Sequence, residues 1–184
     1  KLFDYILENR AVFEKQFKVS RVAGKIENLI YQKVYDDQGN ASLDELDRLF
    51  NKVYEPKIAA QASSRFKLNY FLEKKSSEKY AQEAVKYYKN FPPRDPSELS
   101  DVAYNFYDLD VSNKKMLKKA LKWTKKAVKA DDSLFNYEAM GAVYYKLGKK
   151  RKATKAINKA IDAAKKMKAD YSEIQKLLEK IKAM

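Results

Sequence analysis

The chain of 184 residues contains no histidine and no cysteine. It therefore has no disulfide, no thiolate nucleophile, no Cys/His zinc site and no imidazole base. Most classes of enzyme depend on at least one of these groups. We therefore expect a protein that is not an enzyme, with no catalytic residues, no metal site and no cofactor.

Glycine, proline and long apolar runs are also scarce. Four glycines and four prolines are too few for a turn-rich β-sandwich or a collagenous chain. The longest apolar run is about the length of residues 142–145, whereas a membrane-spanning helix needs roughly 20 apolar residues. No membrane span is expected. The chain begins with Lys1 and shows no leader, so we expect a segment of a longer protein with its targeting signal elsewhere.

The pattern that is present is helical. Apolar residues recur three and four positions apart between nearly all turn signals, which predicts an all-α fold. The first stretch, residues 2–17, predicts one helix with an inward stripe of Phe3, Ile6, Val12, Phe13 and Phe17. A second runs from Val19 to Tyr35, and a capping box of Ser42 and Glu45 predicts the start of a third.

A boundary at Pro92 and Pro93 divides the chain into residues 1–92, with a net charge of +4, and residues 93–184, with +10. In the first part, residues 66–71 and 80–88 are expected to form a degenerate repeat hairpin. The second part is expected to hold two repeats, 96–133 and 134–167, and a capping helix that includes Tyr171 and Ile181. We expect all of these helices to pack as one continuous domain.

The most specific signal lies between Leu134 and Met167. The spacing of Tyr137, Met140, Gly141, Tyr144, Leu147, Gly148, Ala153, Ile157 and Ala160 resembles a tetratricopeptide repeat. Gly141 and Ala153 would let two antiparallel helices approach closely, and Gly148 would supply a left-handed residue after the first helix.

A second copy precedes this repeat, with Ala103, Ala120 and Ala127 at the small packing positions. Its spacing from Ala103 to Ala120 is about five residues longer than that from Gly141 to Ala153, which predicts a longer loop. The resemblance implies a right-handed α-α superhelix of helical hairpins.

Further runs resemble the helical region that follows the thioredoxin fold in a family of bacterial thioredoxin-like proteins of the thiol-disulfide isomerase type. These runs are residues 3–10, 120–123, 144–150 and 170–173. The resemblance implies an accessory module of an exported, periplasmic protein, whose redox chemistry belongs to a preceding domain. That upstream domain is then a candidate partner.

The first helices of stacked hairpins face the concave side of a repeat array, where a partner protein or peptide can contact several repeats. Residues on these helices that are not at core spacing are candidates for binding: Tyr104, Asn105, Tyr107, Glu138 and Tyr145. The alternative, which involves no partner, is that they pack on the neighbouring hairpin or its loop.

Two further hypotheses concern an anion-binding helix and a calcium-binding loop. Residues 114–129 contain eight lysines and no acid, which could bind nucleic acid or another anionic surface. Six of these lysines fall opposite the apolar side of that helix: Lys118, Lys119, Lys122, Lys125, Lys126 and Lys129. This position favours an ordinary solvated face over a nucleic-acid site. Gly39 and Glu45 match positions six and twelve of a calcium loop, but Val34 then stands at its first ligand position and cannot bind the ion, so we expect a plain turn followed by a capped helix.

Overall fold

The computed structural model describes residues 1–184 as eleven helices without a strand, which confirms the all-α prediction. None of these helices combines the length and the apolar character that a membrane crossing requires. Contacts within the chain group residues 1–70 into one compact unit and residues 71–184 into a second. The two units are described separately.

The first unit is built around helix α3 (Val19–Val34). It packs against α1 (Leu2–Glu8), α2 (Arg10–Gln16) and α4 (Leu43–Val53). Residues 56–70 of α5 (Pro56–Glu73) complete this unit. Its core consists of large apolar side chains: Phe3, Ile6, Val22, Ile26, Leu29, Ile30, Val34, Leu46, Leu49, Phe50 and Phe66.

The single helix predicted over residues 2–17 is wrong, because the chain breaks at Asn9. The Asn9 backbone has φ −103° and ψ 16°, and its side-chain Nδ2 donates to the carbonyl of Tyr5 at 2.9 Å. Such local bonds compete with helix continuation. Beyond the break the inward stripe is lost: Phe3 and Ile6 are buried, whereas Val12 is 54% and Phe17 46% exposed.

The connection between α3 and α4 is the expected turn. The Asp36 carboxylate accepts the backbone N–H groups of Gln38 at 2.9 Å and Asn40 at 2.7 Å. Helix α4 begins directly after Ser42, but the Ser42 side chain makes no capping hydrogen bond. Glu45 instead accepts two hydrogen bonds from Arg48, at 2.7 and 2.6 Å. The Ser42 backbone N–H, which the box would pair with Glu45, donates to the carbonyl of Val34 at 2.9 Å.

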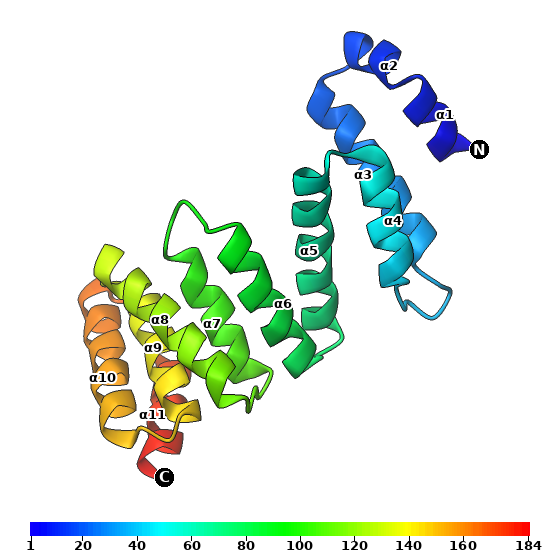
Figure 1. Cartoon of the computed structure of the whole chain (residues 1–184). Coiled ribbons are helices and arrows are strands. Elements are labelled where there is room, and N and C mark those ends of the chain that lie inside the picture. The colour runs from blue at the N-terminus through cyan, green and yellow to red at the C-terminus, as the bar shows by residue number, and fades with distance from the viewer. The chain divides into compact units, whose positions relative to one another are not determined.

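The second unit contains α6 (Ser77–Asn90), α7 (Glu98–Asp108), α8 (Lys114–Ala130), α9 (Leu134–Lys146), α10 (Lys150–Met167) and α11 (Ser172–Lys182) (Figure 1). Helices α7 with α8, and α9 with α10, form two hairpins that contact each other, and α11 packs on α10 and α9. Helix α6, which we assigned to residues 1–92, groups here because it packs on α7 and α8. Its Tyr80 and Tyr88 contact the rings of Phe106 and Trp123, with centroids 6.0 and 5.9 Å apart.

The small residues of the predicted repeats are buried between helices. They are Ala103, Ala120, Ala127, Gly141, Ala153 and Ala160, with the ring of Tyr144 beside them. A Cβ atom on Gly141 would lie 2.5 Å from Cδ1 of Ile157. Backbone and side chain therefore touch directly at this point of the α9–α10 hairpin.

Three helices of this unit end in the same hydrogen-bonded motif. After α9, Lys149 N donates to Tyr144 O at 2.9 Å and Gly148 N to Tyr145 O at 2.8 Å, with Gly148 at φ 69°. This is a Schellman motif. Asp110 after α7 and Lys168 after α10 take the same role at φ 55° without being glycine.

The extra length of the first hairpin is only partly in its loop. Loop 109–113 is two residues longer than loop 147–149. The other three residues extend α8, which starts six residues before Ala120, whereas α10 starts three residues before Ala153. Asn113 accepts the N–H groups of Lys115 and Met116 at 3.0 and 3.3 Å, which caps the earlier start.

Candidate interaction surface on helices α7 and α9

The five predicted binding residues lie together on two packed helices. Tyr104, Asn105 and Tyr107 belong to α7, and Glu138 and Tyr145 belong to α9. All five are half-buried. We call this group the α7/α9 surface.

One end of the surface is polar. The Tyr104 hydroxyl donates to Oε1 of Glu138 at 3.3 Å, which joins α7 to α9. Nδ2 of Asn105 donates to the hydroxyl of Tyr80 on α6 at 2.8 Å. Because these hydrogen bonds come from three helices, the packing of the hairpins fixes the positions of the polar groups.

The other end is aromatic. The Tyr107 ring lies 5.6 Å from that of Tyr104 and 6.0 Å from that of Tyr145, the latter edge-on at 75°. Nζ of Lys180, on α11, donates to the Tyr107 hydroxyl at 3.1 Å. Tyr107 of the first hairpin thus packs on Tyr145 of the neighbouring hairpin, and Tyr107 also contacts the last helix.

A cavity of about 250 Å³ opens at the polar end. Tyr104, Asn105 and Glu138 line it together with Ser100, Asp101, Phe135 and Ala139. Ser100 is only 2% exposed, and its Oγ has no hydrogen-bond partner. Phe135 is 65% exposed.

Sequence reasoning missed Ser100, Asp101 and Phe135 as lining residues. A signal for them exists, because Phe135 lies three residues before Glu138 on α9, and Ser100 and Asp101 lie four and three residues before Tyr104 on α7. Residues at these spacings share a helix face. Extending each candidate by one helical turn would have found all three.

The electrostatics of the surface follow from burial. Burial raises the pKa of the Glu138 carboxyl; the hydrogen bond from Tyr104 opposes this shift, and the charges of Asp108 and Glu173 add to it. Burial and the neighbouring Glu138 raise the pKa of the Tyr104 hydroxyl in turn. The cavity at the polar end thus presents two carboxyl groups, Asp101 and Glu138, in a chain with a net charge of +14.

The lysines of α8 lie elsewhere on the second unit. The six predicted on the solvated face are all exposed, while Leu117, Ala120, Thr124 and Ala127 on the other face are buried. None of the lysines between residues 114 and 129 is in an ion pair.

Comparison of the chain with models of protein families, with curated proteins and with solved structures finds no match.

Proposed function

We propose that this chain is a non-catalytic interaction module whose α7/α9 surface binds a segment of a partner protein. The observation that carries the proposal is the cavity lined by Ser100, Tyr104 and Glu138. It combines a buried hydroxyl without a partner with an exposed aromatic ring, Phe135. Buried polar atoms in folded proteins are nearly always hydrogen-bonded, so the unpaired Ser100 hydroxyl needs an explanation, and the one proposed here is a group of a bound partner.

The lining indicates the chemistry of that group. Asp101 and Glu138 supply carboxylate oxygens, and Ser100 supplies a hydroxyl oxygen. A partner segment that offers hydrogen-bond donors, such as a lysine or arginine side chain next to an apolar residue, would satisfy them and cover Phe135. This combination of an aromatic anchor and a few polar groups is typical of peptide-binding grooves.

The resemblance to tetratricopeptide repeats and to thioredoxin-like proteins supports a wider proposal. The two hairpins with α11 would form a right-handed superhelix, and the module would serve as the accessory region of an exported thioredoxin-fold protein. A thioredoxin-like domain of the same protein is then the first partner to test. No membrane or nucleic acid is required by this function.

The experiment is a calorimetric titration of the 184-residue chain with that domain as a separate polypeptide. The double variant Tyr104→Ala, Tyr145→Ala should bind more weakly, by at least tenfold if the tyrosines anchor the partner. Tyr104→Phe removes only the hydroxyl that Glu138 accepts, and so separates the polar contribution from the ring.

Tyr137→Ala is the matched control. Tyr137 is a half-buried tyrosine of α9 as well, but its hydroxyl accepts a hydrogen bond from Lys159 on α10 at 3.2 Å instead of facing α7. Its replacement should leave affinity unchanged. If the double variant keeps the affinity and the melting temperature of the parent, the binding site lies elsewhere than on the α7/α9 surface. A large loss of stability would show that both tyrosines belong to the core.

A second candidate function is binding of nucleic acid or another anionic surface by α8, favoured by its exposed lysines without ion pairs. Non-specific phosphate contacts weaken steeply between about 50 and 200 mM salt. If the lysines only solvate the helix, binding to mixed DNA or RNA should be weak and should vanish over that range. Submicromolar binding at physiological salt would favour this second function.

A further inference from the structure

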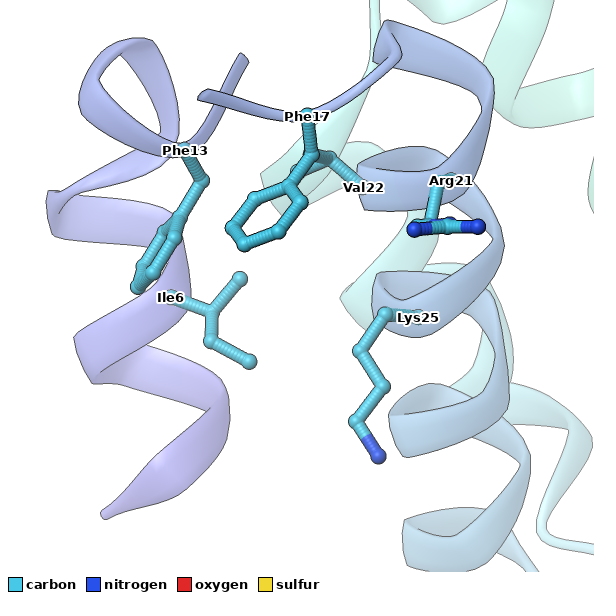
Figure 2. Close-up of a pocket in the computed structure, with 6 residues that line it drawn as sticks. All are labelled: Ile6, Phe13, Phe17, Arg21, Val22 and Lys25. Carbon is cyan, nitrogen blue, oxygen red and sulfur yellow. The ribbon is translucent and has the colours of Figure 1, made fainter. Parts of the chain in front are cut away.

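The first unit contains a second cavity, of about 280 Å³, between the two N-terminal helices and the start of α3. Four apolar side chains converge on it: Ile6 from α1, Phe13 from α2, Phe17 from the connection between α2 and α3, and Val22 from α3 (Figure 2). Ile6 and Val22 are buried, while Phe17 remains 46% exposed. We call this the α1–α3 cavity.

The backbone explains why these side chains leave a space. The break at Asn9 separates α1 from α2, and the extended backbone of Phe17, with φ −127° and ψ 158°, ends α2 before α3 begins. Two short helices and the start of α3 therefore surround the cavity without closing it. An apolar hollow left open to solvent in this way is typical of a docking site.

Two cations, Arg21 and Lys25, line this hollow. Residues 15–26 contain Lys15, Lys18, Arg21 and Lys25 and no acidic residue. None of these four cations forms an ion pair.

Several other cations of the same unit are paired. Arg10 contacts Glu14 at 2.7 Å, and Lys52 contacts Asp4 at 3.0 Å. The cations beside the α1–α3 cavity are therefore free to meet carboxylates from outside the chain.

We propose that the α1–α3 cavity docks an acidic amphipathic segment of a partner protein, with one large apolar side chain between Phe13 and Val22 and a carboxylate on Arg21 or Lys25. Arg21 and Lys25 lie one helical turn apart on α3 and both line the cavity, so one carboxylate can contact either. This site differs from the α7/α9 surface in position and in charge, and it stands independently of the function proposed there.

Size and shape favour a protein segment over two other occupants. The volume of about 280 Å³ lies just below the range of pockets that hold drug-sized molecules, roughly 300 to 1,000 Å³, and suits one or two side chains. A lipid surface is met by protruding apolar residues on an amphipathic face, whereas Ile6 and Val22 line a hollow. A helix that inserts its apolar residues into a groove matches both features.

The test is a selection of helical peptides from a display library against the 184-residue chain, followed by NMR of the chain labelled at Ile and Val methyl groups. Enriched peptides should carry an apolar residue with Asp or Glu three or four positions away. Their addition should shift the methyl signals of Ile6 and Val22. Absence of enrichment, enrichment without acidic residues, or unshifted Ile6 and Val22 signals overturns the proposal.

Single-residue variants then assign the contacts. Lys25→Gln or Arg21→Gln should weaken the selected peptide about twofold to fivefold, the size of an exposed charge contact. Phe17→Ala should weaken it at least fivefold and should leave the fold intact, because this side chain is half exposed. Lys57→Gln, which removes an exposed α5 lysine that does not line the cavity, is the matched control.

Two results would contradict the assignment of partner or site. If Lys57→Gln weakens the peptide as much as Lys25→Gln, only net charge matters. If phosphatidylglycerol vesicles bind the chain through Phe17 and perturb the Ile6 and Val22 methyl groups while no peptide does so, the cavity serves a membrane surface and the proposed protein partner is wrong.

Discussion

Replacing Gly141 with alanine tests how closely α9 and α10 approach. The added Cβ would lie 2.5 Å from Cδ1 and 2.6 Å from Cγ1 of Ile157, although carbon atoms pack best about 3.5 to 4.0 Å apart. Ile157 is fully buried on α10, so its side chain has no solvent-filled space to move into. The variant must either displace Ile157 or separate the two helices.

Two opposing effects set the magnitude. Overpacking a core costs about 1 to 3 kcal/mol, and exchanging a helical glycine for alanine gains about 0.5 to 1 kcal/mol. Gly141→Ala should therefore destabilise α9 and α10 by up to about 2.5 kcal/mol. At Gly24, within α3, an added Cβ meets no atom within 4 Å, so Gly24→Ala should stabilise its own unit by about 0.5 to 1 kcal/mol.

Amide hydrogen exchange is the suitable assay, because it reports the stability of α3 and of α10 residue by residue. Ile157→Ala should cost about 2 to 5 kcal/mol alone. Combined with Gly141→Ala it should cost less than the sum, with a coupling of about 0.5 to 3 kcal/mol. If Gly141→Ala stabilises the protein as Gly24→Ala does, or if the two changes simply add, the close approach at Gly141 is refuted.

Three further changes test other features of the second unit. Gly148→Ala places a Cβ on a residue at φ 69° and should lower the stability by about 1 to 2 kcal/mol in urea unfolding; an unchanged midpoint would argue against the left-handed turn. Asn136 is buried and donates to the carbonyl of Asp131 at 2.7 Å. Asn136→Leu should therefore lower the free energy of unfolding by about 1 to 3 kcal/mol, because that carbonyl loses its partner. A stability equal to the parent's would mean that water replaces the amide. Burial raises the pKa of Glu138, so the folded state binds this proton more tightly than the unfolded state and loses stability as pH rises through the raised pKa. Glu138→Gln should therefore stabilise the protein at neutral pH and lose this advantage below about pH 4, whereas an equal gain at both pH values would rule out titration of Glu138 as the cause.

Much of the second unit was predictable because its helices follow a strict spacing. Gly141 and Ala153 at small packing positions, with Gly148 after the first helix, predicted the α9–α10 hairpin that the structure contains. The same spacing selected Tyr104 and Glu138, which form a hydrogen bond between two helices. A residue beside the core stripe of a packed helix lies close to the neighbouring helix, so its side chain can contact that helix.

Other features left no mark in the apolar pattern. The break at Asn9 depends on a side-chain hydrogen bond to Tyr5, which apolar spacing does not encode. The ends at Asp110 and Lys168 use left-handed residues that are not glycine, so the usual sign of a helix end is missing. The unpaired Oγ of Ser100 arises from tertiary packing, which a single helix face cannot predict.

The contacts of α11 have a consequence for how the second unit unfolds. In simple repeat arrays each repeat touches only its neighbours, and the ends can fray independently. Here Lys180 of α11 reaches Tyr107 of α7, and Lys150 of α10 donates to the carbonyl of Lys182 at 2.6 Å. The last helix thus contacts both the first hairpin and the second, so the region from α7 to α11 is expected to unfold as one cooperative unit. Detachment of α11 would remove a hydrogen bond from Tyr107, which lies 73 residues before Lys180 in the sequence.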